Sequence, residues 1–216
     1  MFFSKSLILD QKELNGVALA THSPAESEIE NEFLEKLKAG DAAAFDTLVT
    51  RYTTDIYALL HRLTEDAEEA RDLTQETFLR ALKAVKNFRG DADLKTWLYR
   101  IAINESRNRF RWWKRRNRSK TISLDAELSQ TNITLIEIIE GNSANPESET
   151  LRRERQTALR VALKKLSAHY REAIVLRDIE GLSYEEVAAA LDANIGTVKS
   201  RIARGREELR KMLEGL

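Results

Sequence analysis

The sequence has no cysteine, only 2 prolines and 8 glycines among its 216 residues, and 3 histidines that are scattered singly. Without cysteine there can be no disulfide, thiolate catalysis, or cysteine-based zinc or iron–sulfur site, and the composition is typical of a reducing compartment. So few turn-forming residues exclude a sheet protein with many tight turns, so an all-α chain is predicted. Lone histidines also argue against a histidine-rich metal site, and no cofactor is expected.

Long apolar runs are missing as well. No stretch approaches the roughly 18 to 20 apolar residues that a membrane-spanning helix needs. Near the N-terminus, the apolar residues 7–9 are followed by Asp10, Lys12 and Glu13, which interrupt the run before a secretory signal could form. We therefore expect a cytoplasmic protein with no direct insertion into a membrane.

Charge is balanced overall, with 35 basic and 35 acidic residues, but it is unevenly distributed. Residues 107–120 contain eight basic residues and no acid, whereas residues 121–151 contain six acids and no base. This order suggests a surface that binds a polyanion, followed by a segment that the polyanion repels. A solvated helix end followed by a disordered linker would give the same pattern.

The spacing of apolar residues divides the first half of the chain into an arm and three predicted helices. Residues 1–25 lack it and are predicted to form a flexible arm. Over 41–64 the apolar residues recur at spacings of three and four, which predicts a helix with one buried face. A second helix over 66–87 has acidic residues crowded into its first three turns, where the helix dipole favours them. A third helix begins near Leu94 and loses its apolar stripe beyond Asn104.

The second half contains a helix-turn-helix pattern after a polar linker. Ser183 followed by Glu186 matches a capping box, and Leu182 with Val187 can form a hydrophobic staple. An eight-residue helix, a short turn around 191–194 and a longer helix complete the motif. The outer face of the longer helix bears donors suited to phosphates and base edges: Thr197, Lys199, Ser200, Arg201, Arg204 and Arg206. Any amphipathic helical hairpin can share this pattern.

Three segments together resemble a known family. They are DLTQETFLRAL (72–82), FRGDADLKTWLYRIAINESRN (88–108), and GLSYEEVAAAL with GTVKSRIARGREELRKML (181–213). They resemble the bacterial sigma-70 family and, more narrowly, the sigma-E-like extracytoplasmic function sigma factors, which retain only the second and fourth sigma domains. The resemblance implies an RNA polymerase sigma factor that directs promoter-specific transcription initiation in response to an envelope or environmental stress, and not an enzyme.

The resemblance also implies a domain organisation. Two small helical domains, one a bundle and one with the helix-turn-helix, would be joined by a flexible acidic linker. The expected division is an arm over 1–25, sigma domain 2 over 26–118, the linker over 119–149 and sigma domain 4 over 150–216. Domain 2 would bind core polymerase and recognise and melt the promoter −10 element, and domain 4 would recognise the −35 element.

Partners and site residues follow from the same resemblance. The partners are core RNA polymerase (clamp helices of the largest subunit and flap of the second largest), promoter DNA, and an anti-sigma factor that, if membrane-anchored, would hold the protein at the inner membrane and away from the nucleoid. The polymerase-binding residues would be Asp72, Leu73, Gln75, Glu76 and Phe78. The −10 element would be read by Phe88, Arg89, Lys95, Thr96, Arg100, Asn104, Arg107, Asn108 and Arg111. The −35 element would be read by Arg177, Ser183, Tyr184, Thr197, Lys199, Ser200, Arg201 and Arg204.

Several alternatives stay open. The main rival is a two-domain helix-turn-helix activator that binds duplex DNA without acting as a polymerase subunit, and residues 72–82 and the Phe88 loop argue against it. A nucleic-acid enzyme would need a phosphate-binding loop, a metal cluster or a nucleophile–base pair, and the sequence has none of these motifs. Trp97 is expected in the core. Trp112 and Trp113 could pack on the preceding domain, contact DNA or contact polymerase.

Some positions depart from the family pattern. Most relatives have Gly and Pro in the turn where this chain has Asp192 and Asn194, which can also adopt turn geometry or cap a helix. Many relatives have Asp where this chain has Asn108, which leaves the preferred −10 base open. Phe88, in a loop, could form the wall of a base pocket or act as a simple plug.

Overall fold

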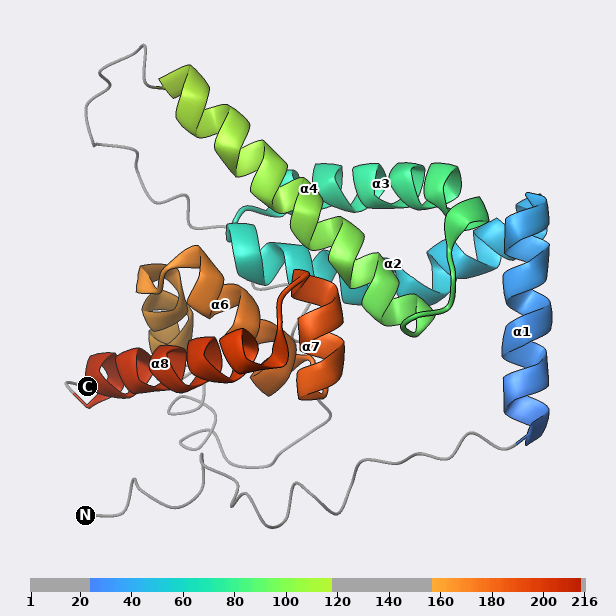
Figure 1. Ribbon diagram of the computed structural model, residues 1–216. Coiled ribbons are helices and arrows are strands. Elements are labelled where there is room, and N and C mark those ends of the chain that lie inside the picture. The colour runs from blue at the N-terminus through green and yellow to red at the C-terminus, as the bar shows by residue number, and fades with distance from the viewer. Residues whose placement is uncertain (1–23, 118–156, 215–216) are drawn as a thin grey trace, which may run out of the picture.

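The computed structural model describes residues 24–117 and 157–214, and every secondary-structure element in these ranges is helical (Figure 1). This confirms the predicted all-α class. The linker predicted over 119–149 lies outside the described residues, and so does the predicted arm apart from the first two residues of α1. Among the described helices, none is both long and apolar enough to cross a membrane.

The elements follow one another along the chain with short connections. In order they are α1 (Pro24–Ala39), α2 (Ala42–Thr64), α3 (Ala67–Ala84), the 3₁₀ turn η2 (Val85–Asn87), α4 (Leu94–Asn117), the helical residues 157–165, α6 (Ala168–Ile174), the π-helical η3 (Val175–Ile179), α7 (Tyr184–Leu191) and α8 (Ile195–Leu213). We call α1–α4 the N-terminal part and residues 157–214 the C-terminal part.

Side-chain caps fix the helix boundaries of the N-terminal part. The Asp41 carboxylate accepts the backbone N–H of Ala44 at 2.8 Å and starts α2. Glu65 ends α2 in the left-handed region at φ 58°, and the Asp66 carboxylate then caps the first turn of α3. A side-chain oxygen that accepts these otherwise unpaired N–H groups stabilises a helix start by about 1 kcal/mol. The break between the two predicted helices is therefore confirmed.

The N-terminal part is built around α2, α3 and α4, which pack against one another. Their inward faces share a core whose large, fully buried members include Leu48, Ile56, Leu73, Leu98 and Tyr99. The second half of α4 extends beyond this core, as Figure 1 shows. The loss of the apolar stripe in the sequence therefore marks the end of burial and not the end of the helix.

The helix-turn-helix is confirmed as α7 and α8. Ser183 and Glu186 form the reciprocal capping box at the start of α7. Asp192 ends α7 in the left-handed region at φ 52°, and Asn194 caps α8 by accepting the Thr197 N–H at 2.7 Å. The two turn residues thus replace Gly and Pro by a left-handed conformation and a helix cap, both of which suit Asp and Asn.

Gly205 lies in the middle of α8, where glycine costs roughly 1 kcal/mol relative to alanine. A Cβ at this position would lie 2.9 Å from Ile174 Cγ1 and 3.3 Å from Tyr170 Cβ. The absence of a side chain therefore allows α8 to cross α6 closely. This contact orients the outer face of α8.

The two parts contact each other directly. Helix α4 packs against α7, and α2 packs against α6 and η3. In Figure 1 the C-terminal part lies alongside the middle of α4, and α1 lies at the far end of the N-terminal part. The polar side chains that join the two parts are described with the site.

Candidate nucleic-acid interface

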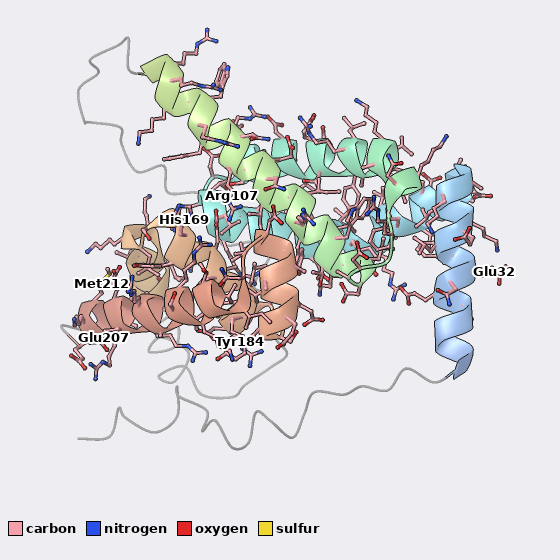
Figure 2. All side chains as sticks on the ribbon, in the orientation of Figure 1. Glu32, Arg107, His169, Tyr184, Glu207 and Met212 are labelled. Atoms are coloured by element: carbon pink, nitrogen blue, oxygen red, sulfur yellow. The ribbon has the colours of Figure 1, made fainter. Side chains whose placement is uncertain are left out.

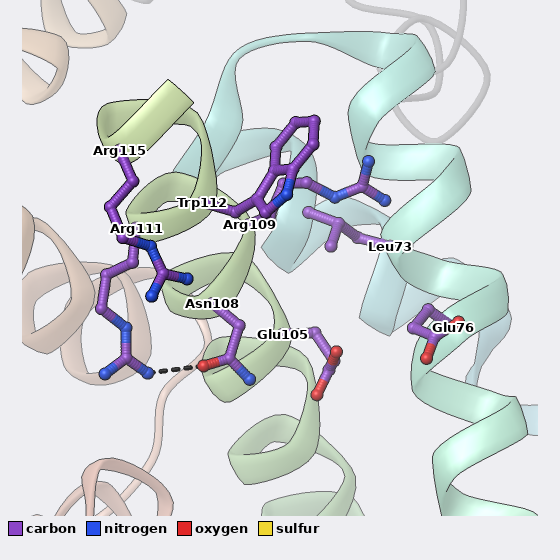
Figure 3. Close-up of a pocket in the computed structure, with 8 residues that line it drawn as sticks. All are labelled: Leu73, Glu76, Glu105, Asn108, Arg109, Arg111, Trp112 and Arg115. Carbon is purple, nitrogen blue, oxygen red and sulfur yellow. Dashed lines mark hydrogen bonds between the residues drawn. The ribbon is translucent and has the colours of Figure 1, made fainter. Parts of the chain in front are cut away.

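A groove of about 640 Å³ runs between α3 and α4 (Figure 3). Its lining combines Leu73 and Glu76 from α3 with Asn108 and Arg111 from α4. The Arg111 guanidinium donates a hydrogen bond to Asn108 Oδ1. The groove thus brings together residues that the sequence assigned to two different partners, polymerase and the −10 element.

The polymerase set divides by burial. Asp72 and Gln75 are exposed on α3, Glu76 is half-buried, and Leu73 and Phe78 belong to the core. The buried pair supports the helix and is not available to a partner in this conformation.

Sequence reasoning missed two exposed apolar residues on the same helix, Leu79 and Leu82, whose exposed fractions are 53% and 45%. Their exposure could have been predicted, because neither leucine falls on the apolar stripe that α3 buries. Beside them, Arg80 pairs with Glu105 at 2.7 Å and with Glu76 at 3.3 Å, and so links α3 to α4. Helix α3 therefore presents a mixed surface of exposed leucines and charged groups.

The −10 set is split between surface and core. Asn104, Asn108 and Arg111 are exposed and recur at helical spacing along one face of α4. Phe88 and Thr96, by contrast, are buried, at 8% and 2% exposure. The Phe88 ring lies 5.0 Å from that of Trp97, which is itself packed on the core as predicted.

Two more basic residues of the −10 set, Arg89 in the loop and Lys95 in the first turn of α4, differ in how they are held. Arg89 is exposed. Lys95 pairs with Asp55 at 2.8 Å and lies over the Tyr99 ring, with its Nζ 5.5 Å from the centroid. Lys95 is therefore tied to α2 and α4, whereas Arg89 is held by no such pair among the described residues.

Two arginines of the −10 set point toward the C-terminal part. Arg107 donates two hydrogen bonds to the Glu172 carboxylate, at 2.9 and 2.5 Å, and this bonding raises the pKa of the guanidinium. Arg100 pairs more loosely with Asp192 at 3.4 Å. In Figure 2, Arg107 lies where α4 approaches α6. Sequence reasoning missed Glu172, because it lies 65 residues from its partner and no local pattern connects them.

The −35 set lies on α7, α8 and η3. Lys199, Ser200 and Arg204 are exposed on α8, and Thr197 and Arg201 are partly exposed beside them. The structure brings these five residues onto one stretch of helix, as the sequence predicts.

The other members of the −35 set have identifiable structural roles. The Tyr184 ring is contacted by two cations, with Arg177 Cζ 4.7 Å and Lys199 Nζ 5.5 Å from its centroid. Arg177 also donates to the Leu182 carbonyl at 2.6 Å and so braces the turn before α7. The Ser183 hydroxyl accepts the N–H of Glu186 in the capping box, so its oxygen is used within the protein.

The basic end of α4 carries three exposed aromatic side chains. Phe110 is 65% exposed, Trp112 44% and Trp113 48%. The two indole rings meet edge to face with centroids 6.1 Å apart, and the Arg116 guanidinium lies 5.0 Å from the Trp112 centroid. Trp112 lines the groove between α3 and α4, so one side of its ring packs toward the preceding helix. Both tryptophans otherwise stay exposed, which leaves contact with DNA and contact with polymerase as open possibilities.

Fold and site together define a two-part helical protein that has a helix-turn-helix in its second part and basic helix faces in both. Comparison with known families gives two matches, to sigma-70 region 2 over residues 48–117 and to sigma-70 region 4 over residues 156–209. The first range contains α4, and the second contains α7 and most of α8.

Relatives of known function match along most of the chain. The RNA polymerase sigma-H factor of Pseudomonas aeruginosa is 39% identical over 190 residues, which cover 88% of this chain and 96% of the relative. The ECF RNA polymerase sigma-E factor of Escherichia coli K12 is 37% identical over 184 residues, which cover 85% and 93%. Among solved structures, the sigma factor RpoE in complex with the anti-sigma factor NepR from Bartonella quintana is 27% identical, with a TM-score of 0.61 and coverage of 79% of this chain and 96% of that one. CnrH, solved in complex with the cytosolic domain of CnrY, has the same fold at 24% identity and a TM-score of 0.60.

The chain belongs to the sigma-70 family of bacterial RNA polymerase sigma factors, in its extracytoplasmic function subfamily. Its function is that of an RNA polymerase sigma factor, and the rival assignment as a polymerase-independent activator is not favoured.

Proposed function

We propose that this sigma factor binds core RNA polymerase through α3, reads the promoter −10 element with α4 and its preceding loop, and reads the −35 element with α8. It performs no catalysis of its own and acts by binding and positioning, in response to an envelope or environmental stress. The observation that carries the proposal is the presence of two separate helix faces, one on each part: amide and basic side chains on α4, and hydroxyl and basic side chains on α8. We propose domain limits of 26–118 and 150–216, with 119–149 as the linker.

The polymerase contact is assigned to the outer face of α3. Asp72, Gln75 and Glu76 supply polar and acidic groups, and exposed Leu79 adds apolar area at their side. Such a mixed face suits basic clamp helices in the largest polymerase subunit, because charge complementarity selects the partner while apolar burial adds affinity. Phe78 holds the helix in place from inside, and the flap of the second largest subunit would contact the C-terminal part.

The −10 contact is assigned to the exposed members of the predicted set. Asn104 and Asn108 offer amide edges that can hydrogen-bond to unpaired bases, and Arg111 offers a donor for phosphate. Arg89 extends this surface into the loop. Because Phe88 and Thr96 are buried, their proposed role is to hold the loop against the core and not to touch DNA.

The −35 contact is assigned to the exposed face of α8. Lys199, Ser200 and Arg204 can reach phosphates and base edges when the helix enters the major groove. The contacts of Arg177 and Lys199 with the Tyr184 ring fix the start of this surface. A helix that enters the major groove reads duplex DNA, whereas amide edges can pair with unpaired bases, so the two parts would read different forms of DNA.

Regulation by an anti-sigma factor is part of the proposal. It is supported by the likeness to the RpoE structure, which was solved in complex with the anti-sigma factor NepR. A membrane-anchored anti-sigma factor would hold this protein at the inner membrane, and its release would let the protein reach the nucleoid from the cytoplasm.

Run-off transcription tests the proposal. Purified core polymerase is incubated with genomic fragments, with and without the protein, and the transcripts are mapped. We expect discrete new transcripts whose upstream sequences share a −10 and a −35 element. If the protein bound duplex fragments without polymerase and produced no new transcript, the assignment as a polymerase subunit would be wrong.

A further inference from the structure

The groove between α3 and α4 contains an aromatic ring and two guanidinium groups that the proposed contacts do not use. The ring is that of Trp112, which is 44% exposed, lines the groove and stands between α4 and α3 in Figure 3. The neighbouring Trp113 is exposed to a similar extent, at 48%, but does not line the groove. Asn108 lies one helical turn before Trp112 and brings an amide to the same space, and buried Leu73 adds an apolar patch from α3.

The two guanidinium groups belong to Arg109 and Arg115, which also line the groove. Arg115 is exposed, and no carboxylate in the described ranges pairs with it. Arg109 Nε lies 3.5 Å from Glu69 Oε1, but within the described part of the chain that oxygen accepts no hydrogen bond. The donors of both arginines are therefore available, and the planar guanidinium fork matches the oxygens of a phosphate.

Two carboxylates line the groove as well, those of Glu76 and Glu105. Arg80 pairs with both, at 3.3 and 2.7 Å, so a cation on α3 offsets their charge. The carboxylates are therefore engaged, whereas the guanidinium groups beside Trp112 stay free for an anion.

We infer that this groove binds one unpaired nucleotide, whose base stacks on Trp112 and whose phosphate is held by Arg109 and Arg115. Its volume of about 640 Å³ lies within the range of about 300 to 1,000 Å³ that is typical of ligand pockets. Every base has an aromatic face that can stack on an indole, and the Asn108 amide can hydrogen-bond to the base edge. The Arg116 guanidinium lies 5.0 Å from the Trp112 centroid, so the base takes the groove side of the ring or displaces this exposed side chain.

Two sources can supply such a nucleotide, a melted promoter strand or a free nucleoside phosphate. Asn108 and Arg111, which are proposed −10 contacts, line the same groove. For a promoter strand the inference therefore rests on the proposed function, and Trp112 extends the −10-reading surface of α4 toward α3 by one stacked base.

Strand binding is measured on the full chain, without polymerase, by anisotropy of a fluorescein-labelled thymidine hexanucleotide. Trp112→Ala should weaken binding roughly fivefold to hundredfold, because base–aromatic stacking is lost. Trp112→Phe keeps an aromatic ring and should retain most of the affinity. Trp113→Ala removes a similarly exposed indole from outside the groove and should leave the affinity unchanged. Circular dichroism checks that each variant is folded.

The base and the phosphate are tested separately. A hexanucleotide with the same sugar–phosphate backbone but no bases should bind the wild type as weakly as the ordinary strand binds Trp112→Ala. Arg115→Gln should reduce the slope of log affinity against log salt by about 0.7, the value for one phosphate contact on a single strand. Lys114→Gln removes the same charge from the adjacent exposed residue, which does not line the groove, and should change the slope less.

Two further readouts identify the occupant. In Trp113→Phe the remaining indoles are Trp112 and the core residue Trp97, so quenching of tryptophan fluorescence by the strand reports a base on Trp112. Thymidine monophosphate is then added as a competitor. Displacement only at concentrations far above the Kd of the strand assigns the groove to DNA, and displacement near that Kd assigns it to a free nucleotide.

Three results would overturn the inference. Unchanged affinity of Trp112→Ala, or an equal loss in Trp112→Ala and Trp113→Ala, means that the groove holds no base. Equal binding of the strand without bases means that α4 binds by charge alone. Loss of core polymerase binding in Trp112→Ala with unchanged strand affinity makes the groove a polymerase contact. Run-off transcription by the wild-type protein tests the sigma-factor assignment separately, because it does not depend on a base entering this groove.

Discussion

The two DNA-facing helices of this protein differ in how accessible they are. On α8, Lys199 and Arg204 face solvent, and no carboxylate among residues 24–117 and 157–214 pairs with Arg204. On α4, Arg107 is paired with Glu172 of the C-terminal part. The exposed face of α8 is therefore open, whereas one arginine of the predicted −10 set on α4, Arg107, is held by the C-terminal part.

This difference matches the order in which the two forms of DNA become available. Duplex −35 DNA exists before the protein arrives, but the bases of the −10 element can be read only after the strands separate. The pairing of Arg107 with Glu172 leaves the first step unaffected, because α8 is open.

The largest expected effect is a loss of stability from a substitution that pushes α8, which carries the open surface, away from α6. Gly205→Leu would place a side chain where a Cβ already lies 2.9 Å from Ile174 Cγ1. Overpacking of this kind should lower the free energy of unfolding of the C-terminal part by about 1–3 kcal/mol. Urea unfolding followed by circular dichroism measures it. Gly196→Ala, whose Cβ would be 3.4 Å from Asn194 Oδ1, is the tolerated control.

Arg204→Ala tests the open surface without disturbing the fold. Loss of an arginine contact to a base edge or phosphate should cost roughly 1–3 kcal/mol of binding to a duplex promoter in the closed complex. Electrophoretic mobility shift with polymerase holoenzyme measures this loss. Lys211→Ala removes one charge from the far end of the same helix and is the matched control. Equal affinity of both variants would exclude Arg204 from the interface.

The double variant Asp72→Lys/Glu76→Lys tests whether the outer face of α3 contacts core polymerase. Placing like charges opposite a basic partner should weaken core binding by about 1–2 kcal/mol while helical content stays the same. Anisotropy titration with labelled protein gives the affinity. The same reversal at Glu32 and Glu35 on α1 should have no effect, and an unchanged affinity of the first variant would remove α3 from the contact.

A smaller loss of stability is expected from Ser183→Ala, which tests whether this member of the −35 set caps a helix or contacts DNA. Because the Ser183 hydroxyl caps α7, Ser183→Ala should lower the free energy of unfolding by about 1 kcal/mol. Duplex affinity, corrected for the folded fraction, should stay at the wild-type value. A loss of affinity in fully folded protein would instead place Ser183 in the DNA contact.

The sequence was a good guide to local structure. The capping box at Ser183, the turn through Asp192 and the helix that follows were predictable, because each depends on residues within one or two helical turns of one another. The spacing of apolar residues likewise predicted α2, α3 and the first half of α4. The family resemblance, confirmed by the comparisons, then supplied candidate residues for each partner.

Tertiary placement was not predictable in the same way. Glu172 and Glu180 find their partners 65 and 81 residues away, and nothing in a list of charged residues selects Arg107 or Tyr99 over other donors. The burial of Phe88 was left open, since a loop position is compatible with either a base contact or a plug. Such features depend on how the helices pack and not on local pattern.

Permanganate footprinting of unpaired thymines tests the central claim most directly, namely that α8 reads duplex DNA and α4 reads the melted strand. The promoter is one mapped by run-off transcription, and core polymerase is present throughout. Arg204→Ala should lower promoter occupancy, and thymine reactivity should fall in proportion. Asn108→Ala should keep wild-type occupancy while losing thymine reactivity in the −10 element. Normal reactivity with unaltered base preference in Asn108→Ala would contradict the account and leave α4 as a scaffold.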